Sequence, residues 1–169
     1  MKRQILITLI GTLILLFSLD AVAATLPMTA NISFDTPLAL TKKNDISFGT
    51  VKAGVADTYT ITTAGTVSAA NSGQWLYGAK AAGNITIVGS TTQTLNISVS
   101  GYTASGGVTP ANATCAYAGG ATGSCTISGA TASGTTGKTL LIGVDAVVDG
   151  TQAIGTTATP SFTVTIIYG

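Results

Sequence analysis

The chain has 169 residues, of which 46% are hydrophobic and only 8% are charged, and its formal net charge is +1. It contains neither His nor Glu, which excludes a His-based catalytic triad and any metal site that needs imidazole ligands. The scarcity of Lys and Arg also argues against a nucleic-acid partner, because phosphate backbones are bound by clustered cations.

The first residues have the features of a secretory signal peptide, which we predict over residues 1–23. Lys2 and Arg3 precede an apolar run over 5–19, and small residues follow it over 21–24. A membrane anchor is the alternative, but the run is shorter than the roughly 20 residues that span a bilayer. Cleavage after Ala23, or one residue later, leaves a single domain over 24–169 with no stable membrane span. We expect this domain to be exported to the periplasm, the cell surface or the medium.

The exported part has no net charge, because its lysines and aspartates are equal in number. So sparse a charge set does little to keep free monomers apart. These charged residues are Lys42, Lys43, Lys52, Lys80, Lys138, Asp35, Asp45, Asp57, Asp145 and Asp149.

Residues 26–40 alternate in polarity over a long stretch, and the same parity continues through Ile46 and Phe48. An extended ribbon with one apolar edge is suited to fill a groove in another subunit, as a donated strand does. The alternative is that 26–40 is the first strand of a self-complete domain, interrupted at Pro37. The candidate donor residues are Leu26, Met28, Ala30, Ile32, Phe34, Leu38 and Leu40.

No stretch after the leader has helical periodicity, whereas short runs with a period of two recur between Gly and Pro breaks. In one of them, Leu95, Ile97 and Val99 share a face that we expect to be buried. Several such runs predict an all-β fold, specifically an immunoglobulin-like β-sandwich, with a barrel as the alternative. The predicted strands are residues 29–34, 45–51, 58–63, 84–88, 94–100, 114–118, 124–127, 139–148 and 161–168.

Two segments rich in Gly, Ala and Ser, 63–83 and 101–113, are predicted to be loops or irregular hairpin connections. The first contains Trp75 and Tyr77, which are weak candidates for an exposed sugar-binding site. The alternative is that these aromatic side chains fold back over the open end of the sandwich.

Cys115 and Cys125 are the only cysteines, and an exported chain favours a disulfide between them. Closing a loop of this length contributes about 2 to 3 kcal/mol to stability. A metal site would need further Cys or His ligands, so we predict neither a metal nor a cofactor.

The chain ends inside its last predicted strand, where Phe162, Val164, Ile166 and Tyr168 share one face. A terminal strand of this kind either pairs firmly or is offered to a partner. We therefore expect these four residues to take part in the core or in assembly.

Catalysis is not indicated by any group of residues. Asp145 lies in the predicted strand 139–148 and Asp149 directly follows it, so their carboxylates would lie roughly 13 Å apart along that strand. Glycoside hydrolysis requires two carboxyl groups closer than this. We therefore predict that the protein is not an enzyme.

Several short segments carry a resemblance to a known family: Thr29–Ile32, Pro37–Lys42, Asp45–Val51 and Phe162–Tyr168. With these segments the chain resembles the bacterial domain-of-unknown-function family 4402, whose members are similar to spore coat protein U and to chaperone-usher pilins. The resemblance covers nearly the whole exported part.

The resemblance implies an immunoglobulin-like subunit of a fibre or coat, without catalytic residues. It implies a close turn at Phe48 and Gly49, and it matches Tyr168 to the aromatic residue that contributes to chaperone recognition in pilins. The chain differs from pilins in its cysteines, which do not link the first strand to another strand.

These observations favour an exported structural subunit of a bacterial surface fibre, pilus or coat, assembled by strand exchange. Its expected partners are identical subunits or a periplasmic chaperone and usher. The alternative is a monomeric binding module for carbohydrate or surface adhesion, which would act through Trp75 and Tyr77.

Overall fold

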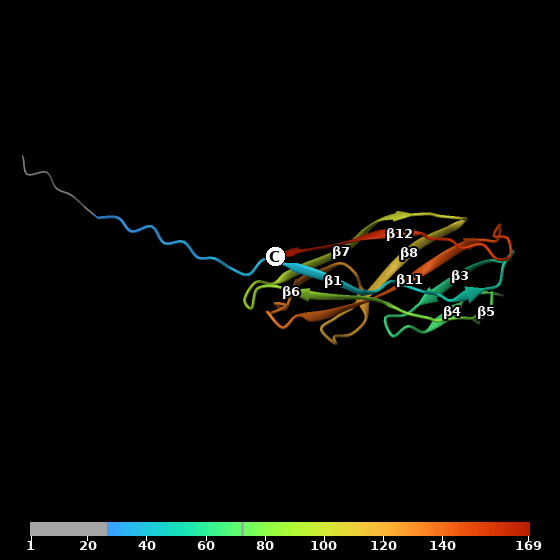
Figure 1. The fold of residues 1–169 in the computed structure, drawn as a ribbon, viewed down its shortest axis with the longest axis horizontal. Helices are drawn as coiled ribbons and strands as arrows, with labels where there is room; N and C mark the ends of the chain where they lie inside the picture. The colour runs from blue at the N-terminus through green and yellow to red at the C-terminus, as the bar shows by residue number, and fades with distance from the viewer. Residues whose placement is uncertain (1–26, 72) are drawn as a thin grey trace, which may run out of the picture. The chain divides into compact units, whose positions relative to one another are not determined.

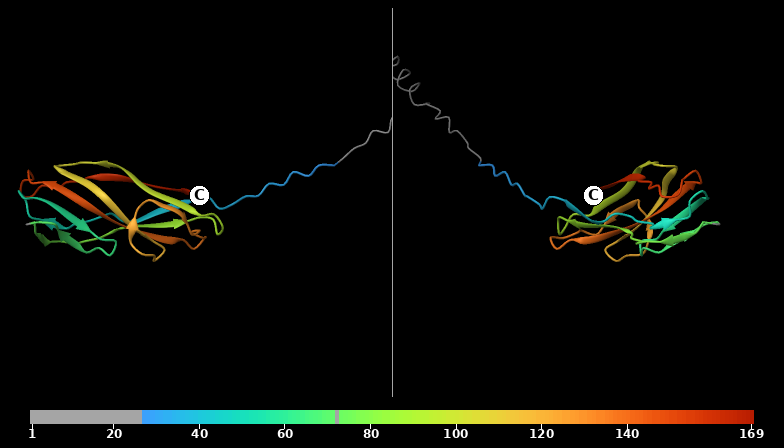
Figure 2. Two further views of the ribbon diagram at one scale, coloured as in Figure 1. Left: turned by 180° about the vertical axis from the view of Figure 1, so that it is seen from behind. Right: turned by 45° about the vertical axis from the view of Figure 1, so that its right-hand side comes forward.

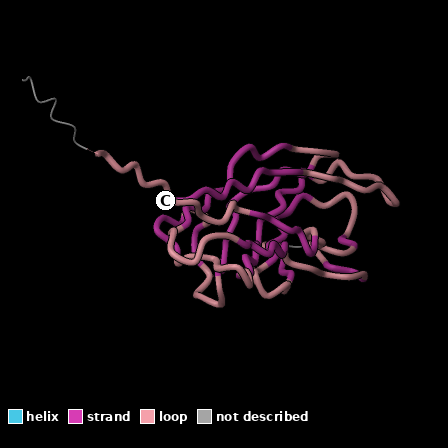
Figure 3. The backbone as a smooth tube through the Cα atoms, turned by 60° about the vertical axis from the view of Figure 1, so that its left-hand side comes forward, coloured by secondary structure: helices cyan, strands magenta, loops and turns pink. Residues whose placement is uncertain are grey.

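The computed structural model describes residues 27–71 and 73–169, so the predicted leader and Leu26 lie outside the described residues. The regular structure of this part consists of antiparallel strands, and Figure 3 shows strands and loops there without a helix. The prediction of an all-β fold is therefore confirmed.

The chain divides into two units, Met1–Phe34 and Asp35–Gly169. The described residues of the first unit, 27–34, form no strand, which differs from the strand predicted over 29–34. All twelve strands belong to the second unit. They are β1 (Ala39–Asn44), β2 (Thr50–Val51), β3 (Ala56–Ile61), β4 (Val67–Ala69), β5 (Trp75–Tyr77), β6 (Gly83–Val88), β7 (Leu95–Thr103), β8 (Val108–Tyr117), β9 (Gly123–Ser124), β10 (Ile127–Ala130), β11 (Lys138–Asp149) and β12 (Ser161–Tyr168).

Strand β11 is the centre of the larger, seven-stranded sheet. One of its edges pairs first with β6 and then with β3, and its other edge pairs with β8. Strands β1, β4 and β9 extend the sheet beyond β6, β3 and β8. A second sheet has the order β10-β7-β12, and a short ribbon pairs β2 with β5. Figure 1 shows β7 and β12 running side by side, as their pairing requires.

The main core lies between the two larger sheets, because its buried side chains come from both of them. Leu140 and Ile142 enter it from β11, and Leu95, Ile97 and Ile166 enter it from β7 and β12. The alternation of small polar and larger apolar residues along these strands is what gives each sheet one apolar face. A smaller cluster, formed by Tyr59, Val108, Ala146 and Val148, lies toward the other end of β11.

The predicted disulfide lies within this core. The Sγ atoms of Cys115 and Cys125 are 2.02 Å apart, and both residues are buried in the main core. Cys115 lies on β8, whereas Cys125 lies between β9 of the first sheet and β10 of the second. The cross-link therefore fixes the point at which the chain changes sheets.

Both segments predicted to be loops contain strands. Strands β4 and β5 lie within 63–83, and 101–113 contains the end of β7 and the first half of β8. These segments contain more strand than predicted, because pairing with a neighbouring strand stabilises their residues in spite of their weak strand propensity. Pro110 is an example, since it lies on β8 opposite Ala146 of β11.

The Asp57 carboxylate anchors the connection between β4 and β5. It accepts hydrogen bonds from the backbone N–H groups of Thr58 (2.7 Å), Asn71 (2.9 Å) and Gly73, and from the Asn71 amide (3.2 Å). Burial is the largest influence on its pKa and raises it, but the hydrogen bonds together outweigh burial. The pKa of Asp57 is therefore lowered from its ordinary value of 3.8.

We expect Asp57→Asn to destabilise the protein in a pH-dependent way. A carboxylate whose pKa is lowered by folding stabilises the folded state above its ordinary pKa, and this stabilisation is lost as the pH falls through the lowered value. Urea unfolding should show a difference between wild type and Asp57→Asn that is largest near pH 6 and shrinks below about pH 4. Asp45→Asn, which removes the same charge from an exposed site, is the control. If Asp57→Asn lowers the free energy of unfolding by the same amount from neutral to acid pH, the prediction is wrong.

Candidate functional site

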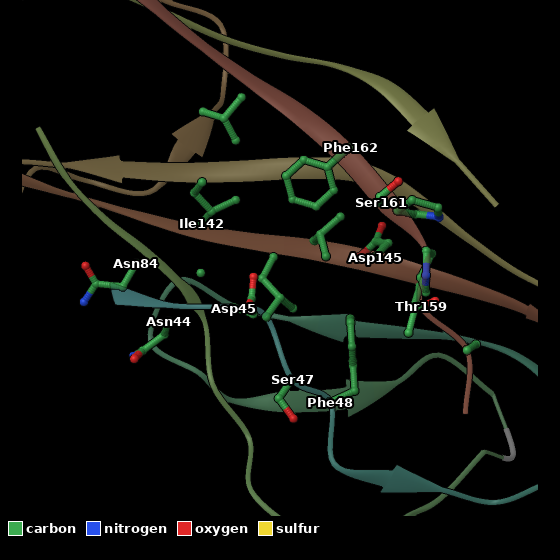
Figure 4. A pocket seen from close by; sticks show the side chains of 18 of the residues that line it. Asn44, Asp45, Ser47, Phe48, Asn84, Ile142, Asp145, Thr159, Ser161 and Phe162 are labelled. Carbon is green, nitrogen blue, oxygen red and sulfur yellow. The ribbon is translucent and has the colours of Figure 1, made fainter. Parts of the chain in front are cut away.

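An apolar groove, which we call the main groove, runs between the end of β1 and the start of β12. Its volume is about 730 Å³, and all its lining residues belong to the unit Asp35–Gly169. Residues 42–49 form one wall and residues 157–164 the other, and the floor contains Ile142 and Val144 of β11. Figure 4 shows Phe162 and Ile142 directed into this space, with Phe48 across from them.

The side chains of β12 show why the main groove is apolar. Its even-numbered residues face the core, and Ile166 is 7% exposed. Phe162 and Val164 pack against the same core but are only half-buried, and they line the groove. The groove is therefore a stretch of core surface that the described part of this unit leaves partly uncovered.

Each wall of the main groove includes part of an edge strand: Lys42 and Asn44 belong to β1, and Ser161, Phe162 and Val164 belong to β12. In the described part of the unit, β1 pairs only with β6 and β12 pairs only with β7. The edge of a sheet presents backbone N–H and C=O groups that can pair with an added strand. The main groove thus combines an apolar floor with two strand edges, which is the geometry that accepts an extended peptide.

Beyond one end of the main groove, the segment that leads into β1 is joined to the end of β12 by a group of residues that we call the terminal clasp: Asp35, Thr36, Ser90 and Tyr168. The Tyr168 hydroxyl donates to the Thr36 carbonyl oxygen (2.6 Å) and accepts from the Ser90 N–H (2.8 Å). The Ser90 hydroxyl donates to the Asp35 carboxylate (2.6 Å). Both views of Figure 2 show the resulting proximity of the C-terminus to the beginning of β1.

The terminal clasp lowers the pKa of Asp35 and holds Tyr168 against its own chain. The hydrogen bond from Ser90, followed by that from the Thr36 N–H, lowers the pKa of Asp35 below its ordinary value. Tyr168 is the residue that the resemblance matches to the C-terminal aromatic residue of pilins, and its hydroxyl is hydrogen-bonded to backbone of the same chain.

The other end of the main groove continues into a second space, which we call the aromatic hollow. It has a volume of about 760 Å³ and is lined by Phe48, Tyr59 and Tyr77 together with aliphatic side chains of β11 and of the 152–158 connection. Phe48, Ala146 and Pro160 line both spaces. The two therefore form one continuous depression.

The candidate donor residues divide between the two units. Met28, Ile32 and Phe34 are exposed by 91%, 77% and 87%, and Ala30 is exposed as well. Leu38 packs against the main core and Leu40 lies on β1, so both belong to the second unit's own structure. The part of the candidate donor strand that is left free to enter another copy therefore ends at Phe34.

Trp75 and Tyr77 do not form a shared aromatic platform. Lys80 Nζ lies 3.8 Å from the centroid of the Trp75 ring, so the ammonium group covers one face of the indole. The Trp75 ring also lies over the turn at Gly49, where φ is +69° and an added Cβ atom would be 2.7 Å from the indole nitrogen. Tyr77, which is 66% exposed, lines the aromatic hollow instead.

The carboxylates of β11 are engaged with separate neighbours. Asp145 accepts hydrogen bonds from Thr60 (2.6 Å) and Asn112 (2.9 Å) at the side of the main groove. Asp149 accepts from the Thr151 and Gln152 side chains at 2.7 and 2.8 Å, where it organises the turn after the strand. In residues 27–71 and 73–169, three or more potential metal-ligating side chains do not come together anywhere.

Sequence reasoning missed most of the floor of the main groove. Ile85, Ile142 and Val144 were recognisable as apolar strand residues, but nothing in the sequence distinguished them from fully covered core. The one sequence feature that indicated the groove was the alternation of 26–40 that continues through Ile46 and Phe48, because both of these residues line the groove.

Comparisons of the chain with protein-family models, with curated proteins and with solved structures found no match. In the part of the chain that the structure describes, no helix has the length and hydrophobicity of a membrane span.

Proposed function

We propose that the protein is an exported, non-enzymatic structural subunit of a bacterial surface fibre, pilus or coat, assembled by strand exchange. The N-terminal segment 26–34 of one copy enters the main groove of the next. The observation that carries this proposal is the main groove itself, which offers two strand edges and an apolar floor in a chain that also has an exposed, alternating apolar segment.

The groove suits an inserted strand because β1 and β12 run in opposite directions along its two walls. Strand β1 begins beside the terminal clasp, whereas β12 ends there. A strand between them would be antiparallel to one wall and parallel to the other, and it could form backbone hydrogen bonds with both. It would also join the two larger sheets, as expected if the unit is an immunoglobulin-like sandwich that lacks one strand.

The composition of segment 27–34 suits burial. It contains no charged residue, so its insertion would desolvate no ionised side chain. Burying Met28, Ile32 and Phe34 stabilises a complex by about 1.5 to 3 kcal/mol for each side chain before ordering costs. Such a contact is head-to-tail and does not close on itself, so repetition produces a filament.

The groove also suits transient protection before assembly. An unassembled subunit would expose its apolar floor, and a chaperone strand could cover it by the same backbone pairing. A periplasmic chaperone and an usher are therefore the proposed partners besides identical subunits. The resemblance to family 4402 supports this reading.

Deletion of residues 25–34 is expected to convert assembled protein into a folded monomer. The deletion must stop before Asp35, because Asp35 and Thr36 form the terminal clasp and Leu38 packs in the core. Light scattering on the purified chain 24–169 and on the deletion variant measures the change. A wild-type chain that stays monomeric, or oligomers that survive the deletion, would refute the proposal.

A matched pair of variants tests whether assembly depends on the apolar residues at alternate positions or only on the presence of the segment. Replacing Met28, Ile32 and Phe34 by Ser should abolish assembly, whereas replacing Thr29, Asn31 and Ser33 by Ala should preserve it. Equal behaviour of the two variants would show that the segment does not insert as an alternating strand.

The alternative function, carbohydrate binding through Trp75 and Tyr77, has less support because Lys80 covers one face of the indole. A glycan array distinguishes the two proposals. Glycan binding by the monomer that is lost in Trp75→Ala would favour the binding module.

A further inference from the structure

We infer that Phe34 of the donating copy is seated in the aromatic hollow of the accepting copy and is the residue that sets the register of the inserted strand. This inference rests on the proposed strand exchange. It goes beyond strand exchange, because an inserted strand could occupy the main groove and leave the aromatic hollow empty.

The terminal clasp determines the direction of insertion. In the accepting copy, residues 35–38 cross the clasp end, where Thr36 is bound by Tyr168 and Leu38 packs in the core. In the donating copy, Asp35 follows Phe34 directly and is bound to its own Ser90. The donor strand must therefore enter the accepting copy's groove from the end away from the accepting copy's clasp. Phe34 is the last donor residue before the donating copy's own clasp, so Phe34 lies at that entry end.

The entry end is the aromatic hollow. Phe48, Ala146 and Pro160 line both the hollow and the main groove, so a strand that leaves the groove there continues into the hollow. With Phe34 beside Pro160, residues two apart along the donor lie roughly 7 Å apart, as they do along β12. Ile32 and Ala30 then lie opposite Phe162 and Val164, and Met28 lies beyond them, toward the terminal clasp.

The chemistry of the hollow suits a phenyl ring. Phe34 is the only aromatic residue in segment 27–34, and the hollow has aromatic walls at Phe48, Tyr59 and Tyr77. Aromatic rings favour edge-to-face and offset contacts with one another. Tyr77, Leu76 and Ile154 are 66%, 46% and 93% exposed, and they line the hollow that the ring would fill.

Photo-crosslinking within the assembled full-length exported chain tests this inference. A benzophenone amino acid is introduced at position 34 in one isotope-labelled copy, mixed with unlabelled wild type, and the crosslinked peptides are identified by mass spectrometry. We expect crosslinks between copies to the peptides that contain Phe48, Tyr77 or Ile154. The same probe at position 28 is the matched control and should crosslink between Val164 and the terminal clasp.

The outcomes separate the inference from the proposed function. Crosslinks from position 34 to residues 36–40 or 166–168 of the other copy would overturn the inference, because they show insertion in the opposite direction, but would preserve strand exchange. Absence of crosslinks between copies from both positions would overturn both. Independently, Phe34→Ala should weaken assembly at least tenfold more than Met28→Ala, and Phe34→Tyr should restore it; equal effects would overturn the register role.

Discussion

Gly143→Ala is expected to destabilise the protein by about 3 kcal/mol, because the new methyl group would collide with backbone that cannot move aside. A Cβ atom at this position would overlap the Ile61 carbonyl oxygen and would lie 2.9 Å from the Thr62 carbonyl carbon. Gly143 is buried in β11, just after the part that pairs with β6 and just before the part that pairs with β3. The glycine permits two strands to share one edge of β11.

Urea unfolding of the monomeric deletion variant measures this effect without interference from assembly. Gly123→Ala is the matched control, because Gly123 lies on the short strand β9 with no heavy atom within 4 Å of an added Cβ. A Gly143→Ala change no larger than that of Gly123→Ala would show that the backbone around Ile61 relaxes freely.

Val164→Lys is expected to abolish assembly while the subunit remains folded. In the free subunit Val164 is half-buried at the main groove, so a lysine there can extend its ammonium group into water. An inserted strand would cover that route and leave an unpaired charge among apolar side chains. The cost of an uncompensated buried charge, about 3 kcal/mol or more, weakens the contact at least about a hundredfold.

Sedimentation over a range of concentrations measures the association, and thermal unfolding confirms that the subunit is folded. Thr165→Lys adds the same charge to the exposed face of β12 and should assemble as wild type does. If both lysine variants assemble equally, the groove face of β12 is not the contact surface.

The local alternation in the sequence was sufficient to predict the strands with strong apolar faces. The predicted strands 84–88, 139–148 and 161–168 correspond closely to β6, β11 and β12, because each alternates or carries a continuous β-branched run. Strand β8 begins earlier than predicted, since Pro110 and Asn112 are poor strand residues in isolation. Asn112 has a φ of 49°, at the irregularity in the pairing of β8 with β11.

The candidate site was predictable only in its components. The apolar parity of Met28, Ile32 and Phe34 and that of Phe162 and Val164 are local properties of the sequence. The groove depends instead on which edges remain unpaired, and this follows from pairings between strands far apart in the chain. The hydrogen bond from Tyr168 to Thr36 joins the end of β12 to the segment before β1. Its two residues are 132 positions apart in the chain, so no local pattern in the sequence predicts it.

The pairing of β1 with β6 has a mechanical consequence for a fibre built from these subunits. Tension along such a fibre would reach each subunit at Asp35 and pass into β1, whose hydrogen bonds to β6 extend from Ala39 to Asn44. Because these bonds lie across the direction of pull, they would be loaded together in shear rather than opened one at a time. In the proposed fibre, β1 would therefore transmit the tension to the rest of each subunit.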